Sequence, residues 1–559
     1  MGRKGPVGLA EFKAVLRKLK TPTDQRFGVG VTGDAKSMAA LLLLREAVGP
    51  ERVTAFTVDH RLKPGSREEA QRLHKTVTAL GVRHEILTAD WTEYETGLLG
   101  DRKDPPIHNP DQLKDSKKGD AARARRHTLL AKACRHRGIP ALIFGHSLDD
   151  QIRIGLKRMS AGSGIEGLSG MKMLCSEVPN TFVPAAKKVQ LLRPLLCFDE
   201  NRLVETCTHF GAPIHNGPTN DLLFISEDVW LSLYLRKLVH ADGDRPDASP
   251  ADSAPNTFDK DAFAHFMALM NQHREAYQKK VRPILDEYTL FDPPSGTCFL
   301  QVRPKAGSFG PPWIKQPHIA LRVLSRVIQW CARAGDNRTW TQPTSIPLDI
   351  LSHFNRSRPD RDTSVGHVQL CRPRANATGA YIWLVGRARM QSQEQRNTAI
   401  VLKLGDTALW DARFLIALQP SPHAPADTTF YGVPPRDLRF VVRALTTADM
   451  KSVINRMRIP PHRGADHSEH VQRSIMHYQK KVPESLQETI PCIALEQDDG
   501  DRSYVVAIPS LSINLEPEVV DVRFSFANHG LLEREERDVG FSMLEEQEIG
   551  DDGGGRKNR

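Results

Sequence analysis

Short apolar segments alternate with longer helical segments over residues 27–160, and this alternation limits the fold more than any other feature of the chain. Such a pattern is typical of βαβ units that feed a parallel sheet. The sequence therefore predicts an α/β domain built on a doubly wound parallel sheet. The expected strands are 27–31, 53–58, 84–87 and 141–144, and the expected helices are 37–48, 66–80, 121–137 and 149–160.

Three polar loops follow these strands, at 32–36, 59–63 and 145–150. Ligands of doubly wound sheets bind beyond the carboxyl ends of the strands, so we expect the three loops to meet at one rim. The first loop ends where a helix begins, and helix amino termini favour anions such as phosphate. The loop is not a Walker A motif, because Asp34 and Ala35 separate Gly33 from Lys36. A tight turn without a ligand remains the alternative.

The other loops offer titratable side chains. Asp59 and His60 fit either a turn-capping pair or the rim of a site. The segment from His146 to Gln151 is a stronger signal, because capping a helix explains a carboxylate but not a histidine. In the preceding helix, Arg123 and Arg126 lie three residues apart and share one face, which is either solvated or a contact surface for an anion.

Composition and charge divide the chain into six expected parts. Residues 1–23 form a basic amphipathic helix, which fits either an organellar transit segment or a surface helix before the first strand. The Asp- and Pro-rich linker cannot offset chain entropy by burial. The remaining parts are the α/β domain at 24–240, the linker at 241–256, a long helix at 257–292, an α+β region at 293–530 and a disordered tail at 531–559.

The overall composition excludes several classes of protein. Lys and Arg number 77 against 67 Asp and Glu, and the net charge of +10 favours a polyanionic partner such as nucleic acid. The eight cysteines are scattered without a CxxC pair, so neither a disulfide framework nor a zinc site is indicated. No apolar stretch reaches the length of about 18 residues that a membrane-spanning helix needs.

Taken together, the motifs resemble the tRNA(Ile)-lysidine synthetases, a family of N-type PP-loop ATP pyrophosphatases with a Rossmann-like fold. The family's Ser-Gly-Gly-x-Asp-Ser-Met loop is similar to Thr32–Met38, and its Gly-Ser-Gly-x-x-Gly-Leu-x-Gly-Met loop is reproduced in full. The matching segments, in family order, are 32–38, 58–60, 122–127, 145–151, 162–171, 193–196 and 218–221.

The resemblance implies a ligase with three substrates. ATP adenylates the C2 oxygen of the wobble cytidine in isoleucine tRNA with a CAU anticodon, and the ε-amino group of free L-lysine then displaces AMP. The implied cofactors are ATP and Mg²⁺, and the implied partners are tRNA and lysine but no membrane; a homodimer is left open. The family slightly favours a mitochondrial over a cytosolic location.

The resemblance also assigns roles residue by residue. The implied catalytic residues are Arg123, His146 and Asp150. The implied ATP-binding residues are Thr32, Gly33, Asp34, Lys36, Ser37, Met38 and Asp59, with Asp34 as the metal ligand. The residues implied to bind tRNA or lysine are Arg126, His60, Asp149, Gln151, Gly162, Ser163 and Gly164.

Several departures from the family pattern reverse a charge. Lys36 and Arg153 replace acids, Asp34 replaces a glycine, and residues 226–230 lack two expected basic residues. Two readings follow. The leading one is an active lysidine synthetase with altered metal handling, and the alternative is a degenerate relative that binds tRNA or protein without catalysis. A tRNA thiolase is less favoured, because that chemistry commonly uses paired cysteines.

Overall fold

The protein consists of two compact units, seen here in a computed structural model. The first comprises Met1–Ala276 and Leu532–Arg559, and the second comprises Tyr277–Leu531. Each unit is described by itself. The structure describes residues 5–62, 64–91, 115–179, 189–215, 259–302, 312–332, 350–351, 362–375, 379–422, 438–457, 465–495, 504–528 and 537–543. The linker expected at 241–256 and the segment 226–230 lie outside these residues.

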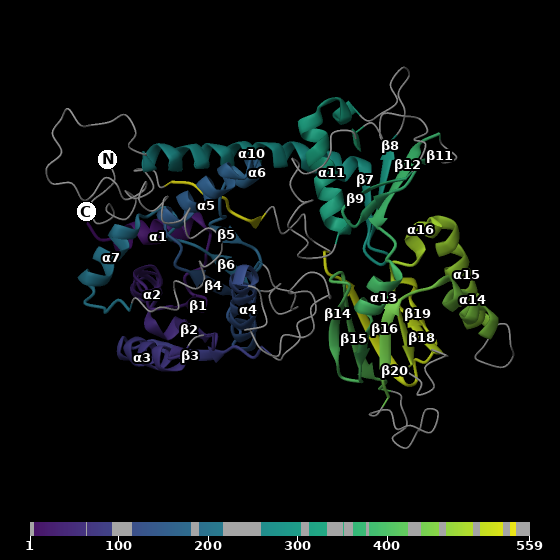
Figure 1. Cartoon of the computed structure of the whole chain (residues 1–559), viewed down its shortest axis with the longest axis horizontal. Helices are drawn as coiled ribbons and strands as arrows, with labels where there is room; N and C mark the ends of the chain where they lie inside the picture. The colour runs from purple at the N-terminus through teal and green to yellow at the C-terminus, as the bar shows by residue number, and fades with distance from the viewer. Residues whose placement is uncertain are drawn as a thin grey trace, which may run out of the picture. The chain divides into compact units, whose positions relative to one another are not determined.

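The first unit contains the predicted α/β domain (Figure 1). The elements are α1 (Leu9–Lys18), β1 (Phe27–Gly30), α2 (Ala35–Val48), η1 (Pro50–Arg52), β2 (Val53–Asp59), α3 (Ser66–Ala79), β3 (Arg83–Thr88), α4 (Asp115–His136), β4 (Ala141–Phe144), α5 (Leu148–Ser160), α6 (Ile165–Leu168), β5 (Leu174–Cys175), β6 (Gln190–Leu192) and α7 (Glu200–His209), followed by α10 (Lys260–Tyr288), which continues into the second unit. The strands and helices predicted over residues 27–160 lie within two residues of their expected bounds, except that α4 begins at Asp115 rather than at 121; β5, β6 and α7 were not predicted.

The sheet of the first unit has the order β3-β2-β1-β4-β6-β5, and every neighbouring pair is parallel except β5 with β6. Phe27 of β1 pairs with Val53 of β2 on one side and with Ala141 of β4 on the other. The chain therefore builds outward from β1 to β3 and then returns to place β4 on the opposite side of β1. This reversal is the point at which a doubly wound sheet binds its ligand.

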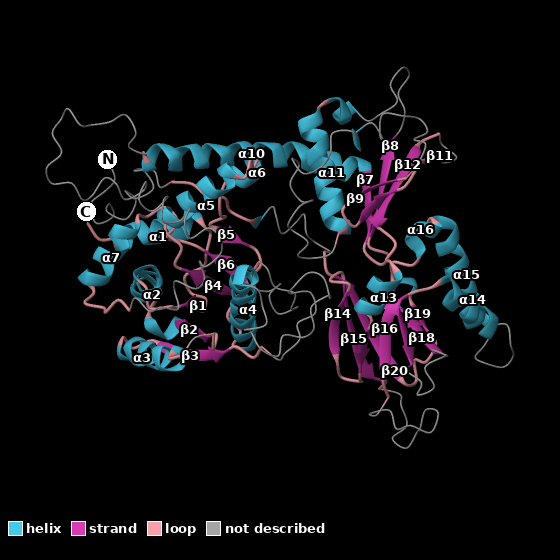
Figure 2. Cartoon of the chain, viewed as in Figure 1, coloured by secondary structure: helices cyan, strands magenta, loops and turns pink. Residues whose placement is uncertain are grey.

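Both faces of this sheet are covered by helices, which confirms the doubly wound fold (Figure 2). Residues that alternate along the strands enter different cores, as Val29 and Ile143 do on one face and Phe56 and Leu142 on the other. Helices α1, α2 and α7 pack on the first face and α4 on the second. At Gly28, an added Cβ would lie only 2.8 Å from the Cys134 sulfur of α4, so glycine lets this helix approach the sheet.

Both ends of the chain contribute to the first unit. The amphipathic helix expected near the amino terminus forms as α1, and its Phe12 is buried in the core. Residues 537–543 are not part of a disordered tail, contrary to the sequence analysis. Phe541 is fully buried, Val539 pairs with Leu174, and Asp538 accepts a hydrogen bond from Lys172 Nζ at 2.7 Å. The acidic composition around this segment predicted disorder and gave no sign that Phe541 would be buried.

The second unit is the expected α+β region. Its described strands form three antiparallel sheets, with the orders β7-β8-β12-β10-β9, β13-β16-β17-β18-β19 and β14-β15-β20. Strand β11 pairs with β12 at the side of the first sheet. The elements are β7 (Thr289–Asp292), β8 (Thr297–Val302), η4 (Pro312–Lys315), α11 (Pro317–Cys331), β9 (Thr363–Val365), β10 (Val368–Leu370), β11 (Arg374–Ala375), β12 (Tyr381–Arg387), α13 (Ser392–Thr398), β13 (Ile400–Leu402), β14 (Thr407–Trp410), β15 (Phe414–Pro420), β16 (Phe440–Ala444), α14 (Thr447–Arg456), α15 (Ala465–Lys481), α16 (Glu484–Gln487), β17 (Pro491–Leu495), β18 (Tyr504–Ile508), η7 (Pro509–Leu511), β19 (Ile513–Asn514) and β20 (Val520–Phe526).

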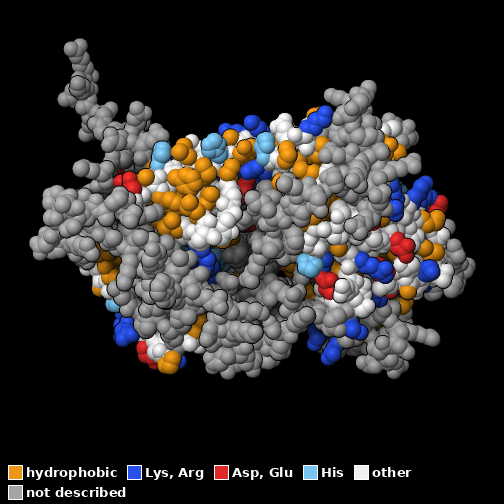
Figure 3. Space-filling view, turned by 45° about the horizontal axis from the view of Figure 1, so that its top comes forward, with side chains coloured by type: hydrophobic (Ala, Val, Ile, Leu, Met, Phe, Trp, Pro, Cys, Tyr) orange, Lys and Arg blue, Asp and Glu red, His pale blue; other side chains and the backbone are white. Residues whose placement is uncertain are grey.

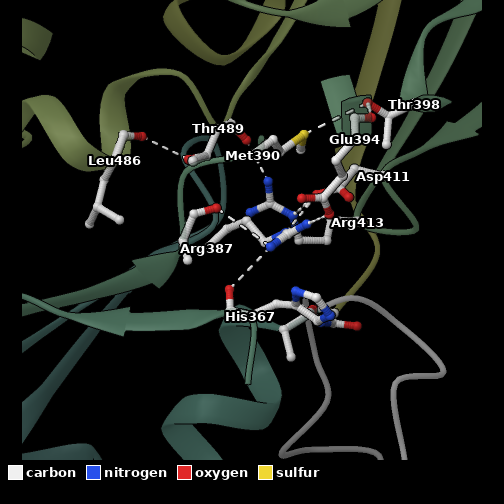
Figure 4. Close-up of polar contacts among 12 residues, drawn as sticks. His367, Arg387, Met390, Glu394, Thr398, Asp411, Arg413, Leu486 and Thr489 are labelled. Atoms are coloured by element: carbon white, nitrogen blue, oxygen red, sulfur yellow. Dashed lines mark hydrogen bonds and ion pairs between the residues drawn. The ribbon is translucent and has the colours of Figure 1, made fainter. Parts of the chain in front are cut away.

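A buried ion cluster joins these sheets (Figure 4). Asp411, in the turn between β14 and β15, accepts hydrogen bonds on Oδ2 from Arg413 Nε at 2.8 Å and from Arg387 Nε at 3.4 Å. The side chains of Asp411 and Arg413 are fully buried. Arg387 also pairs with Glu394 of α13, and Arg413 donates to the carbonyl of Thr489. One buried carboxylate thus holds two guanidinium groups from different strands or turns.

The cysteines, the helices and the surface can be compared with the composition. All eight cysteines are thiols rather than disulfides. Within the described part of the chain, no helix is both long and apolar enough to cross a membrane. Lys and Arg side chains occur at several separate places on the face shown in Figure 3, interspersed with hydrophobic and acidic ones.

Candidate functional site

The loops after β1 and β4 touch at the point where the strand order reverses. At Gly145, an added Cβ would lie 2.4 Å from the carbonyl oxygen of Lys36, so only glycine allows this contact. The amino termini of α2 and α5 therefore open beside each other at the carboxyl ends of two neighbouring strands. The convergence of these two polar loops, expected from the sequence, is present in the structure.

Hydrogen bonds within the loop itself hold the β1–α2 connection. Asp34 caps α2 and accepts a hydrogen bond from Ser37 N at 2.9 Å. Ser37 Oγ accepts from Thr32 N at 3.1 Å and donates to the carbonyl of Asp34 at 3.2 Å. Gly33 has a φ of +88°, a conformation that favours glycine. Met38, which the family resemblance placed at ATP, is instead fully buried in the core.

Lys36 crosses from this loop to the second one. Its Nζ donates to Asp150 Oδ1 at 3.1 Å and lies 3.9 Å from Glu200 Oε2. Arg153 Nη1 donates to the same Asp150 oxygen at 3.0 Å. Burial disfavours the charge of Lys36, but Asp150, Glu200 and Asp34 outweigh it and raise the pKa of the ammonium. Burial also disfavours the charge of Asp150 and would raise the pKa of its carboxyl. Lys36 and the other cations outweigh burial and hold this pKa well below its usual value.

The other Asp150 oxygen is also fully engaged. Asp150 Oδ2 accepts hydrogen bonds from Ser147 N at 3.0 Å and Ser147 Oγ at 3.3 Å, in a capping box at the start of α5. The carboxylate is therefore both the helix cap and the anion between two cations. Neither of its oxygens is left without a donor.

Histidines and one arginine surround the neighbouring strand end. The Arg126 guanidinium lies 5.4 Å from the Phe144 ring centre, and the rings of His127 and His146 also contact Phe144. Burial, followed by the charge of Arg193, lowers the pKa of His146 to about 3. Burial also lowers the pKa of Arg126 to about 10, with Arg123 adding to the effect. At neutral pH the histidine is uncharged and the arginine remains a cation.

His60 completes this group from the end of β2. Burial and the charge of Arg126 lower its pKa to about 4, so its imidazole is neutral at pH 7. In this group, the buried nitrogens His60 Nδ1, His146 Nδ1 and Arg126 Nε have no hydrogen-bond partner among the described residues. Buried polar atoms are usually satisfied, so these nitrogens are candidates for contacts with a ligand or water.

Asp59 and Asp149, which were also expected at the site, make structural hydrogen bonds instead. Asp59 Oδ1 accepts from Arg61 N at 3.0 Å and from Ser66 Oγ at 2.8 Å, which fits the turn-capping alternative. Asp149 accepts from Glu200 N at 2.7 Å and from Lys260 Nζ at 3.0 Å. This aspartate therefore fastens α7 and α10 to α5.

Gln151 positions the glycine-rich loop of residues 162–171. Its side chain donates to the carbonyl of Met171 at 3.2 Å and accepts from Met171 N at 2.8 Å. Gly162 has a φ of +68°, and Gly164 precedes the short helix α6. Ser163 N donates to the carbonyl of Arg158 at 2.9 Å, which closes the end of α5. Gln151, Gly162, Ser163 and Gly164 thus shape this loop in the structure.

The two arginines of α4 differ in their surroundings. Arg123 is exposed, whereas Arg126 is half-buried beside Phe144 and the site histidines. The resemblance implied the reverse arrangement, with Arg123 at the activated intermediate and Arg126 on tRNA phosphates. Sequence reasoning also missed His127 and Lys260 as neighbours of the site. His127 follows Arg126 directly and so does not share its helical face, which left no periodic signal for it. Lys260 follows a long segment without motifs.

The carboxylates at the site do not fit a protein-held Mg²⁺. Mg²⁺ requires oxygen ligands in octahedral geometry. The described residues contain no group of three or more His, Cys, Asp or Glu side chains able to hold a metal. Asp34 Oδ1 caps α2. Asp150 Oδ1 accepts hydrogen bonds from the cationic side chains of Lys36 and Arg153, and its Oδ2 accepts from Ser147 N. Asp34 as a metal ligand is therefore not supported by its surroundings.

Comparisons with known proteins point to one family. The PP-loop domain model matches residues 9–223. The tRNA(Ile)-lysidine synthase of Zymomonas mobilis is 32% identical over 210 residues, which cover 37% of this chain and 55% of that protein. That of Methylobacterium sp. strain 4-46 is 35% identical over 196 residues, 34% of this chain and 47% of that protein. The probable tRNA(Ile)-lysidine synthase of Schizosaccharomyces pombe is 27% identical over 204 residues, 35% of this chain and 41% of that protein.

The extent of these matches is limited. The chain spans about half the length of the curated relatives that it matches, with 55% of the Zymomonas mobilis protein and 47% of the Methylobacterium protein covered. Among solved structures, a U34-tRNA thiolase from Methanococcus maripaludis aligns with 44% of this chain and 84% of its own, at 14% identity and a TM-score of 0.28. A TM-score this low carries no argument, so the fold rests on the sheet described above.

Proposed function

We propose that the chain, whose residues 9–223 match a PP-loop domain and resemble tRNA(Ile)-lysidine synthases, is an ATP-dependent ligase of that family that modifies the wobble cytidine of isoleucine tRNA. Free L-lysine is the proposed second substrate, and lysidine is the product. The location of the protein, mitochondrial or cytosolic, stays a prediction.

The observation that carries this proposal is the meeting of two helix amino termini with buried, partnerless nitrogens at the strand reversal. The α2 amino terminus and Lys36 offer positive potential for the nucleotide phosphates. His60, His146 and Arg126 lie at the neighbouring strand ends and can bind polar edges of a base or an activated intermediate. An anion site beside buried polar side chains is what adenylation of a base requires.

The proposed reaction has two steps. The C2 oxygen of cytidine attacks the α-phosphorus of ATP, so that an O–P bond forms and pyrophosphate leaves. The lysine ε-amine then attacks C2, the C–O bond breaks, AMP leaves with the electron pair, and the nitrogen loses a proton. In both steps the leaving group is an anion, and donors fixed near that charge lower the barrier.

Arg126 is the side chain best placed to stabilise the departing charge. It stays cationic although burial lowers its pKa to about 10. The same cation, with Lys36, disfavours protonation of a lysine amine bound beside it, because like charges favour the neutral form. A neutral amine is the nucleophile that the second step needs. His146 acts in this scheme as a neutral hydrogen-bonding group, since a pKa of about 3 makes it a weak base.

A second candidate function is tRNA or protein binding without catalysis. The closed cluster of Lys36, Asp150 and Arg153 favours it, because the three side chains satisfy one another where a catalytic carboxylate is expected. This reading keeps the scaffold and the basic charge but no ATP turnover.

Mass spectrometry of nucleosides tests the proposal. Isoleucine tRNA with a CAU anticodon is incubated with the full chain, ATP and isotopically labelled lysine, and then digested. We expect labelled lysidine, which is absent when ATP is omitted and strongly reduced in the Arg126→Ala variant. Arg135→Ala, at an exposed position in the last turn of the same helix, is the matched control. Binding of this tRNA without any labelled product would support the non-catalytic function instead.

A further inference from the structure

A lysine side chain, Lys36, lies at the centre of the candidate site. Lys36 Nζ and Arg153 Nη1 lie 3.1 and 3.0 Å from one oxygen of Asp150. The side chains of Lys36 and Asp150 are 15% and 7% exposed, so the pair is shielded but open at one end. A metal ion on Asp150 would have to displace both cations from this carboxylate.

The other carboxylates around Lys36 are engaged or distant. Asp34 caps α2 through Ser37 N, and Asp149 accepts from Lys260 Nζ and Glu200 N. Glu200 Oε2 lies 3.9 Å from Lys36 Nζ and is the remaining acid beside it. The described carboxylates therefore do not converge on one empty position, whereas the lysine ammonium already lies among them.

We propose that the Lys36 ammonium takes the place of a protein-held divalent cation, so that this site binds the polyphosphate of a nucleotide in its metal-free form. The inference rests on the proposed function in so far as both require a nucleotide at this loop. Lys36 lies at the first turn of α2, so a polyphosphate at this helix terminus can accept from its ammonium together with the helix amides. A lysine acts on phosphate as a point charge without needing octahedral geometry.

The charge of the nucleotide gives the proposal a measurable consequence. Metal-free ATP carries more negative charge than its Mg²⁺ complex, so fixed cations attract it more strongly. We therefore expect the dissociation constant for ATP in EDTA to equal or fall below that in excess Mg²⁺, at constant ionic strength. A site that holds a metal on its own carboxylates behaves in the opposite way.

The test is isothermal titration of the full chain with ATP, in EDTA and in Mg²⁺. Lys36→Met removes the charge at similar size, and we expect about a tenfold to hundredfold loss of affinity in EDTA. Lys157→Met, on the exposed part of α5, is the matched control and should bind as the wild type does. Electron paramagnetic resonance with Mn²⁺ gives an independent readout: the wild type should bind none at this site, and Lys36→Asp should gain binding.

The outcomes separate this inference from the proposed function. Wild-type binding that requires Mg²⁺, unchanged affinity of Lys36→Met in EDTA, or Mn²⁺ binding at this site by the nucleotide-free wild type would overturn the role of Lys36 and leave the proposed function standing. The absence of ATP binding under both conditions would overturn both. Metal-independent binding that is lost in Lys36→Met supports the inference even if no lysidine is ever formed.

Discussion

Replacing Asp411 with alanine should strongly destabilise the second unit. The carboxylate is fully buried, and its Oδ2 accepts from Arg413 Nε at 2.8 Å and Arg387 Nε at 3.4 Å. Without it, Arg387 still pairs with Glu394, and Arg413 still donates to the Thr489 carbonyl. The buried charge of Arg413, however, loses its only described acidic partner. Removing one member of a buried ion pair costs about 3–5 kcal/mol, because the remaining charge stays desolvated.

Thermal unfolding of the full chain measures this cost. Five of the seven tryptophans lie in the second unit, at 313, 330, 340, 383 and 410, so tryptophan fluorescence reports mainly on it. For a unit of this size, 1 kcal/mol corresponds to about 2–4 °C in Tm, which predicts a fall of about 6–20 °C. The matched control is Glu469→Ala, whose partner Arg473 is 72% exposed. Breaking such a surface pair should change stability by less than about 1 kcal/mol.

Equal, small effects of the two substitutions would refute this reasoning. They would mean that the cluster is effectively solvated or that the arginines find other acceptors. A second variant separates charge from volume: Asp411→Asn keeps the size of the side chain, and asparagine tolerates the positive φ of 48° at this position. We expect Asp411→Asn to lie closer to Asp411→Ala than to the wild type.

Three further predictions concern the first unit. Because the pKa of His60 is about 4 in the folded state and about 6.5 when unfolded, the unfolded state binds its proton first as pH falls; stability should therefore drop by up to about 3 kcal/mol between pH 6.5 and 4. Urea unfolding at several pH values checks this, and His60→Asn should flatten the slope. Gly145→Ala should abolish ATP binding in the titration above, because its Cβ would lie 2.4 Å from the Lys36 carbonyl oxygen, whereas Gly8→Ala, at a φ of −71° and with the nearest atom 3.4 Å from its Cβ, should not. Phe541→Ala should destabilise this unit by about 3–5 kcal/mol in urea unfolding, since it empties a fully buried aromatic position; a loss below 1 kcal/mol would mean that the segment is dispensable.

The alternation of apolar and helical segments was enough to predict strands β1 to β4 of the first sheet, because each βαβ unit is local in sequence, but it did not predict β5 and β6. Strand β4 begins and ends where the pattern placed it, at Ala141 and Phe144. The same locality predicted that the loops after β1 and β4 would meet. Pairing in the second unit was beyond such reasoning: β15 pairs with β20 across about 100 intervening residues, and no local pattern sets that register.

Side-chain roles were predictable only where a partner lies nearby in sequence. Asp34 and Asp150 follow the ordinary capping pattern, with partners three residues away. Asp149 looked equally available for a substrate, but its partners Glu200 and Lys260 are 51 and 111 residues distant. Phe541 was missed for the same reason, since a single aromatic residue in an acidic segment gives no periodic signal.

Lys36 and Arg153 looked in the sequence like two independent reversals of charge, yet in the structure they share one oxygen of Asp150. Each cation can therefore compensate for the loss of the other. We expect Lys36→Met and Arg153→Met to cost about 1 kcal/mol each in unfolding free energy, because Asp150 keeps one partner in either variant.

The double variant decides whether the two reversals are one change. It would leave Asp150, 7% exposed, with Ser147 as its described capping donor and no cation at its other oxygen, a situation that costs about 3–5 kcal/mol. The sum of the single effects is about 2 kcal/mol, so the cycle should show a coupling of about 1–3 kcal/mol. Urea unfolding with hydrogen-exchange mass spectrometry of α2 and α5 restricts the measurement to this unit. In an Asp150→Asn background the coupling should vanish, because an amide needs no cation. Additive effects in the wild-type background would mean that Asp150 does not link the two residues, and the argument that Lys36 replaces a metal at this carboxylate would lose its basis.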